Sequence, residues 1–202
     1  SFILLFPAFV SAQGFNGGIL AGGNISQVDG DTWKGYHKIG LMAGGYVYYQ
    51  FSPNISLQME MEFIQKGSRH NIDQDNPDDQ SYLLKLNYVE MPLLIVYNVG
   101  RKFSFETGPA MDVLVNYTEE QDGIANPTTE PLRDVTLSGI LGASYRITER
   151  LKVNFRLNYS LISLRDADAP YPASYRKIFF EYGQYNNVLS LAIFWDFKSP
   201  VF

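Results

Sequence analysis

Residues 151–161 read Leu-Lys-Val-Asn-Phe-Arg-Leu-Asn-Tyr-Ser-Leu, and this stretch decides the fold class. Its odd-numbered positions are all bulky and apolar, whereas its even-numbered positions hold Lys, Asn, Arg, Asn and Ser. Successive side chains of a β-strand point to opposite faces, so this pattern predicts a strand with one apolar face and one polar face.

The same alternation recurs along the chain. It is regular in four further segments, at residues 55–63, 103–117, 135–147 and 185–197. Less regular strands are predicted at residues 15–25, 36–51 and 82–99. In the last of these Glu90 and Pro92 interrupt the phase, which predicts a β-bulge at that point. The chain is therefore expected to form eight strands, an even number like that of single-chain bacterial barrels.

The predicted connections between strands alternate between short and long. Short turns are expected at residues 52–54, 100–102 and 148–150. Long loops are expected around residues 27–35, 68–81, 118–133 and 165–183. This asymmetry is typical of outer-membrane barrels. The sequence thus predicts an all-β fold, an eight-stranded antiparallel up-and-down transmembrane β-barrel with short periplasmic turns and long extracellular loops.

The orientation of the two faces distinguishes a membrane barrel from a soluble lipocalin-like barrel. The interior of an eight-stranded barrel is only just wide enough for side chains. The polar face mixes charged residues with Gly and Ser and would fit inside, whereas the apolar face is bulky and suits hydrocarbon. Aromatic residues near strand ends are expected in the interfacial girdles of the membrane. They are Tyr46, Tyr48, Tyr97, Phe103, Tyr117, Trp195 and Phe197.

The N-terminal segment carries information about the compartment. Residues 1–12 combine an apolar run with a final Val-Ser-Ala and are predicted to be the C-terminal part of a signal peptide. The natural start is then expected upstream, and residues 13–202 form a single barrel domain. The alternative is a buried N-terminal strand or helix. No other apolar run approaches the roughly 18 residues that a transmembrane helix needs.

Charged residues on the predicted inner face are close to balanced in sign. Such residues can neutralise one another inside a barrel, whereas a single unpaired buried charge costs several kcal/mol. We therefore predict a closed, polar lumen that contains a charge network, with Lys38 among the bases that face the acids. The network comprises Glu60, Glu62, Lys85, Glu90, Glu106, Asp112, Arg146, Lys152 and Arg156. The alternative is an acid dyad drawn from Glu60 and Glu62, which share one face, together with Glu106, but ion pairing is favoured.

Residues 88–94, Tyr-Val-Glu-Met-Pro-Leu-Leu, resemble a motif of the PorT-like outer-membrane β-barrel proteins of the Bacteroidetes. Tyr88, Glu90 and Pro92 match the characteristic positions of this motif. The Gly-rich first strand and the aromatic chain end, with Phe202 last, agree with the resemblance. It implies an eight-stranded barrel in the bacterial outer membrane. The founding member is associated with a secretion and gliding apparatus. Most relatives have no assigned activity, so the resemblance does not imply that role for this chain.

Several functions and sites are not favoured by the composition. The net charge of −5 and the scattered bases argue against nucleic acid as a partner. Cysteine is absent, which excludes disulfides and thiolate sites. The histidines are His37 and His70, and the Ser68–His70 spacing matches no known catalytic arrangement, so no catalytic residue and no cofactor are predicted. A candidate surface cation site lies in a segment that lacks two positions of a calcium loop. Its residues are Asp73, Asp75, Asp78 and Asp79.

The predicted function is that of a non-enzymatic barrel embedded in outer-membrane lipid. It presents its loops to a partner at the cell surface, or serves as an accessory subunit of an outer-membrane complex. The alternatives are a narrow pore or small-solute transporter and, less favoured, a hydrolase at the barrel rim.

Overall fold

The computed structural model describes residues 15–31, 33, 35–72, 80–125, 131–165, 174–178 and 181–198. Eight long strands form the barrel: β1 (Phe15–Asp29), β2 (Lys38–Gln50), β3 (Ile55–His70), β4 (Tyr82–Val99), β5 (Phe103–Gln121), β7 (Val135–Arg146), β8 (Leu151–Ser160) and β11 (Tyr185–Asp196). The short β6 (Ile124–Ala125) pairs with β5, and β9 (Arg176–Ile178) pairs with β10 (Glu181–Gly183). No helix in the described part of the chain could cross a membrane.

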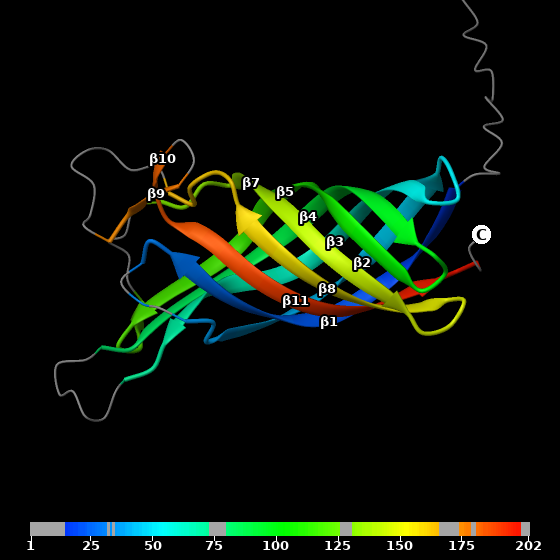
Figure 1. The fold of residues 1–202 in the computed structure, drawn as a ribbon. Coiled ribbons are helices and arrows are strands. Elements are labelled where there is room, and N and C mark those ends of the chain that lie inside the picture. The colour runs from blue at the N-terminus through cyan, green and yellow to red at the C-terminus, as the bar shows by residue number, and fades with distance from the viewer. Residues whose placement is uncertain are drawn as a thin grey trace, which may run out of the picture.

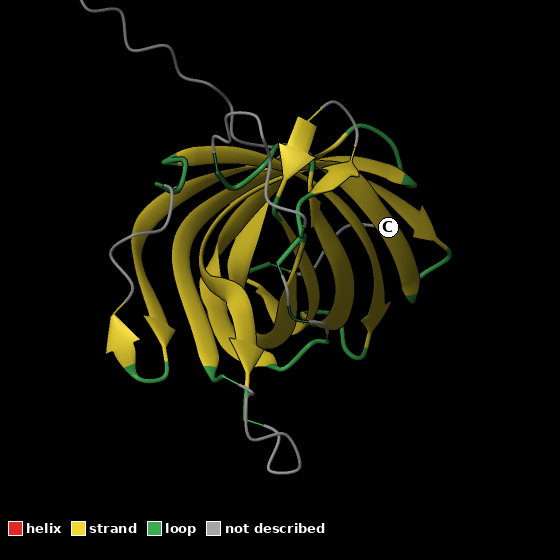
Figure 2. Cartoon of the chain, turned by 90° about the vertical axis from the view of Figure 1, so that its left-hand side faces the viewer, coloured by secondary structure: helices red, strands yellow, loops and turns green. Residues whose placement is uncertain are grey.

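The barrel is closed by antiparallel pairing throughout. The order around it is β1, β2, β3, β4, β5, β7, β8 and β11, and β11 pairs back onto β1 (Figures 1 and 2). The turns that follow β2, β4 and β7 lie at one end, which we call the short-turn end. The longer connections lie at the other, the long-loop end, at the left of Figure 1. The predicted eight-stranded antiparallel barrel is confirmed.

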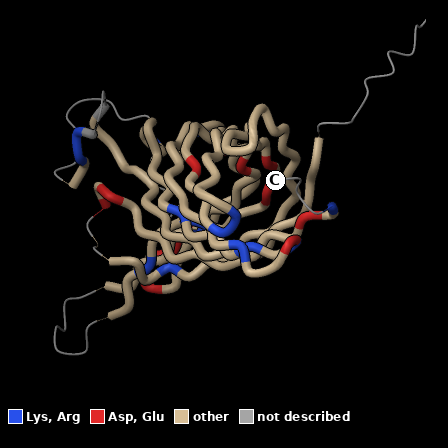
Figure 3. Tube along the Cα trace, turned by 45° about the vertical axis from the view of Figure 1, so that its right-hand side comes forward, with Lys and Arg blue, Asp and Glu red and all other residues tan. Residues whose placement is uncertain are grey.

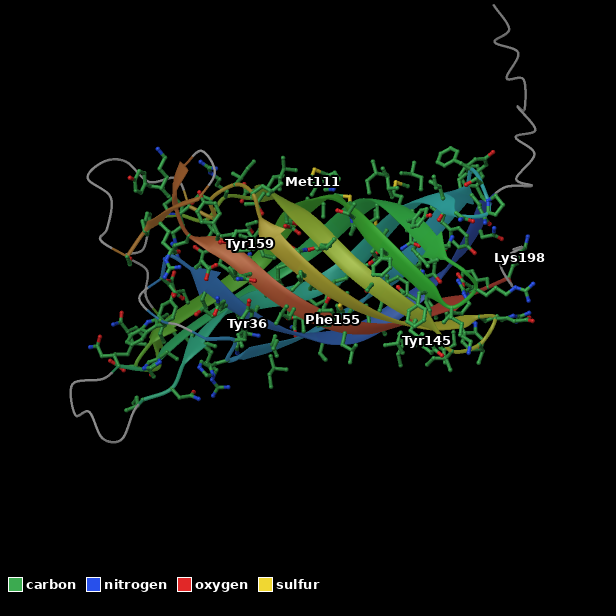
Figure 4. The ribbon with its side chains drawn as sticks, in the orientation of Figure 1. Tyr36, Met111, Tyr145, Phe155, Tyr159 and Lys198 are labelled. Atoms are coloured by element: carbon green, nitrogen blue, oxygen red, sulfur yellow. The ribbon has the colours of Figure 1, made fainter. Side chains whose placement is uncertain are left out.

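The apolar face of the strands points outward. Leu41 and Leu141 are 66% and 58% exposed, and many large apolar side chains on the other strands are similarly exposed. Figure 4 shows Met111 and Phe155 projecting from the outer wall. The polar residues of the alternating pattern instead point into the interior. Figure 3 shows that charged residues lie along the strands of the barrel as well as at its ends. The soluble-barrel alternative, which requires the apolar face inside, is therefore wrong.

Strand β4 differs from the expectation. Leu84, Leu86 and Tyr88 face inward in one phase with Glu90 and Pro92, so the strand has no phase break at Glu90. The register shift instead precedes Glu90 and lies between Asn87 and Tyr88, where β4 pairs with β5. The misreading has a physical cause. Along β4 the inward-facing residues change from apolar to acidic, because different depths of the barrel interior hold different kinds of side chain. In the sequence, this change in polarity looks like a change in which residues face inward.

Two of the predicted girdle aromatics also face the interior. Tyr46 and Tyr48 are buried, and the Tyr46 hydroxyl donates a 2.8 Å hydrogen bond to Asp196. Gly18 on the neighbouring strand makes room for this ring, because a Cβ there would lie 2.6 Å from the Tyr46 hydroxyl oxygen. The remaining aromatics of the predicted set are exposed on the outer wall: Tyr97, Phe103, Tyr117, Trp195 and Phe197.

Candidate functional site

The candidate site is a buried layer of charged side chains in the barrel, here called the ionic layer. Its members are Glu60, Glu62, Lys66, Glu90, Glu106, Asp112, Lys152 and Arg156. They come from β3, β4, β5 and β8, where every second residue faces the axis. Glycines on neighbouring strands leave the space that the long side chains fill. At Gly142, for example, a Cβ would lie 2.7 Å from a carboxylate oxygen of Glu106.

Arg156 crosses the interior and joins three strands. Its guanidinium donates two hydrogen bonds to Glu60, at 2.6 and 2.7 Å, and one to Glu106 at 2.5 Å. Asn154 donates a further 2.8 Å hydrogen bond to Glu106. Two-point pairing of guanidinium with carboxylate is the strongest form of this interaction. Strand β8 is thereby tied to β3 and β5 through the lumen rather than around the wall.

Lys66 forms the second connection. Its ammonium pairs with Glu90 and, at 3.0 Å, with Asp112. Asn158 donates 2.9 Å hydrogen bonds to both oxygens of Glu90. Lys66 was not among the residues predicted for the lumen, because the third predicted strand ended at residue 63. The signal was present, since residues 64, 66 and 68 continue the even-numbered inner face.

Lys152 and Arg146 lie nearer the short-turn end. Lys152 is buried, and its ammonium lies 4.7 Å from the ring centroid of Phe194 and 5.2 Å from that of Tyr46. Arg146 is partly buried and pairs with Asp196 at 2.9 Å. A small cavity of about 30 Å³ lies among these groups. It is large enough for about one water molecule.

Lys85 does not belong to this layer, and its assignment to the lumen is wrong. It occupies an outward-facing position on β4, between the buried Leu84 and Leu86, and its side chain is exposed. Lys38 is buried, but its ammonium bonds to the carbonyl of Ile39 at 2.8 Å. The charges that act most strongly on Lys38 are those of Lys85 and Arg69. Lys38 is therefore not a partner of the lumen acids.

The three residues of the motif, Tyr88, Glu90 and Pro92, all face the barrel interior from β4. Tyr88 is buried, with its ring centroid 5.5 Å from the Lys66 ammonium. Glu90 is the Lys66 partner. Pro92 faces inward on the same strand and lacks an N–H for the ladder. The motif thus contributes to the packing and charge of the interior.

Apolar residues and an ion pair cover the interior toward the long-loop end. Leu84, Leu132 and Leu164 are buried there, the last two supplied by the connections that follow β5 and β8. These connections bind each other through a 2.8 Å hydrogen bond from the Arg133 amide to the Leu164 carbonyl. Arg165 pairs with Glu119 at 2.7 Å. We call this group of side chains the loop cap.

The long-loop end also carries the histidine that was considered for catalysis. The His70 ring stacks on Trp33 with centroids 3.9 Å apart. The Trp33 amide donates a 3.0 Å hydrogen bond to Asp31. Burial raises the pKa of Asp31 to about 6. The His70 ring is thus packed against an aromatic side chain at this end of the barrel.

Some predicted features lie outside the described residues. They are the signal peptide at residues 1–12, the chain end at Phe202, and the candidate cation site of Asp73, Asp75, Asp78 and Asp79. Within the described ranges, no group of three or more His, Asp or Glu side chains is placed to hold a metal ion.

A family model described as an outer membrane protein beta-barrel domain matches residues 11–166. The chain belongs to this family. Members of the outer membrane protein beta-barrel family lie in the outer membrane, so the short-turn end faces the periplasm and the long-loop end faces outward. No curated protein matches the chain in sequence.

Two solved structures show the same fold. Ail, the attachment invasion locus protein of Yersinia pestis, is 13% identical, with a TM-score of 0.52 over 91% of this chain and 99% of that one. Neisserial surface protein A is 11% identical, with a TM-score of 0.55 over 90% of this chain and 97% of that one. At these identities the similarity establishes the barrel fold and leaves the function to the site itself.

Proposed function

We propose that this protein is a non-enzymatic outer-membrane barrel with a closed interior, which presents its extracellular loops to a protein partner. The observation that carries the proposal is the Arg156 crossing. A fully buried guanidinium spans the barrel interior from β8 to Glu60 on β3 and Glu106 on β5. Lys66, also fully buried, links β3 to Glu90 on β4 and Asp112 on β5.

The loop cap supports closure at the extracellular side. A solute entering there would have to displace Leu132 and Leu164 and then separate Arg165 from Glu119. Removing one partner of a buried ion pair costs about 3–5 kcal/mol, so opening both the cap and the ionic layer would be rare. This favours a closed barrel over the narrow pore or small-solute transporter.

The extracellular connections are then the surface available for function. Ile124, the first residue of β6, is 73% exposed, and Ile72 is also exposed. A partner in an outer-membrane complex would bury such side chains. We include the PorT-like assignment in this proposal on the strength of Tyr88, Glu90 and Pro92.

Closure is tested by reconstituting the full chain in planar lipid bilayers and in liposomes. We expect no stable large conductance and no swelling in small sugars. The matched variant is Arg156→Ala, Lys66→Ala, which removes both crossing cations and should give measurable conductance if it inserts. Steady channels from the unaltered protein would establish the pore instead.

The partner is tested by cross-linking in native outer membranes. We expect Ile124→Lys to abolish a discrete cross-linked species, because it places a charge on the exposed apolar side chain. The matched control is Glu149→Lys, a change on the exposed periplasmic turn between β7 and β8. Equal loss in both variants, or no discrete species in the unaltered protein, would contradict a loop-bound partner.

A further inference from the structure

The ionic layer carries more negative than positive groups. Its five carboxylates, Glu60, Glu62, Glu90, Glu106 and Asp112, face three cations, Lys66, Lys152 and Arg156. All eight side chains are buried. The charge balance expected from the sequence does not hold, because Lys38, Lys85 and Arg146 all lie outside the layer and only Lys66 is gained. Two carboxylates therefore lack a counter-charge within the layer.

Cations elsewhere in the described interior do not supply the missing charge. Arg146 pairs with Asp196, which belongs to the periplasmic end of the lumen. Arg165 pairs with Glu119 in the loop cap. Lys38 bonds to a backbone carbonyl, and the charges that act on it are cationic. Each of these groups is thus engaged away from the ionic layer.

Glu62 is the first of the two uncompensated acids. It is 2% exposed, and its Oε2 has no hydrogen-bond partner. Glu60, two residues away on the same face, already takes two of the Arg156 hydrogen bonds, and Glu90 lies directly opposite on β4. On the other side, β2 offers only Gly44 at the position paired with Glu62. The charged groups acting on Glu62 are Glu90, Glu60, Arg156 and Lys66.

Glu90 and Asp112 form the second excess. They are directly opposite each other in the β4–β5 register and share a single cation, the Lys66 ammonium. One oxygen of Asp112 binds Lys66, and the other, Oδ2, has no hydrogen-bond partner. Two carboxylates on one ammonium leave one negative charge over.

We propose that the ionic layer is a proton-binding site that holds two protons, one on Glu62 and one shared between Glu90 and Asp112. An uncompensated ion in a protein interior costs several kcal/mol, and protonation of the carboxylate removes that cost. A protonated carboxyl is also a hydrogen-bond donor, so protonation allows Glu62 Oε2 and Asp112 Oδ2, which have no partner, to form hydrogen bonds. The described acids are not grouped as a metal site, so a proton fits where a coordinated ion does not.

The proposal is tested by infrared spectroscopy of the full chain in detergent micelles at neutral pH. A protonated carboxyl has a carbonyl stretch that shifts in deuterium oxide. We expect two such bands, one of which disappears in Glu62→Gln. The matched control is Glu149→Gln on the exposed periplasmic turn, which should leave both bands unchanged.

A bound alkali ion is separated from a proton by replacing sodium chloride with choline chloride at the same ionic strength. Bands that persist in choline support protons. If Glu62→Gln fails to fold, [δ-¹³C]Glu labelling of the unaltered protein still decides the matter, because one Glu carboxyl must show the shift of the protonated form. Absence of any protonated carboxyl at neutral pH would overturn the proposal, whether or not the barrel conducts.

Discussion

Arg156→Met is the substitution that tests the reasoning about the interior most directly. Methionine fills much of the same volume but removes the guanidinium that bonds to Glu60 and Glu106. Removing one partner of a buried ion pair costs about 3–5 kcal/mol. Two carboxylates lose their cation here, so the free energy of unfolding should fall by at least about 3 kcal/mol, more than a hundredfold in the folding equilibrium.

The assay is equilibrium unfolding by urea of the chain folded into lipid vesicles. Trp195, on the outer wall of β11, reports loss of contact with lipid through its fluorescence. The compensating variant combines Arg156→Met with Glu60→Gln and Glu106→Gln. Replacing a whole buried ion group by neutral side chains is often close to neutral. We therefore expect this triple variant to recover to within about 2 kcal/mol of the unaltered protein.

Two results would refute this reasoning. The first is a loss of less than about 1 kcal/mol in Arg156→Met, which is the value of an exposed pair and would mean that water solvates the acids. The second is a triple variant no more stable than Arg156→Met alone. That result would show that the guanidinium acts through packing rather than through its charge.

Three further predictions concern the inward Lys66 compared with the outward Lys85, the strained Gly67, and Asp31 at the extracellular end. Lys66→Met should cost about 3–5 kcal/mol in the same urea assay, whereas Lys85→Met, on the outer wall, should cost under about 0.5 kcal/mol. Gly67→Ala should cost roughly 1–3 kcal/mol or more in that assay, because Gly67 has a φ of +130° and its Cβ would lie 2.0 Å from the Leu84 carbonyl oxygen. Burial raises the Asp31 pKa from 3.8 to about 6, so Asp31 favours the folded loop most at acid pH and this contribution is lost as pH rises through 6. Trp33 fluorescence in a Trp195→Phe background should follow that titration, and Asp31→Asn should abolish it; an unchanged titration in Asp31→Asn would contradict the assignment.

The alternation in residues 151–161 was sufficient to assign β8, its two faces and the inward position of Arg156. This works because the side-chain period of a strand is local and needs no knowledge of neighbours. The same rule failed at β4, where the inner face is apolar at Leu84 and acidic at Glu90. The environment of an inner position depends on its depth in the barrel, and depth is set by all the strands together.

The sequence by itself determined that eight strands with an apolar and a polar face close into an outer-membrane barrel. Only the tertiary structure decided which charges meet. Arg156 and Glu60 are 96 residues apart, and their pairing depends on the accumulated register of the strands between them. The same register places Lys66 inside and Lys85 outside, and it keeps Lys38 and Arg146 out of the ionic layer, which therefore has two more acids than bases. Strand register is fixed by the whole closed sheet, and for that reason no local pattern could reveal it.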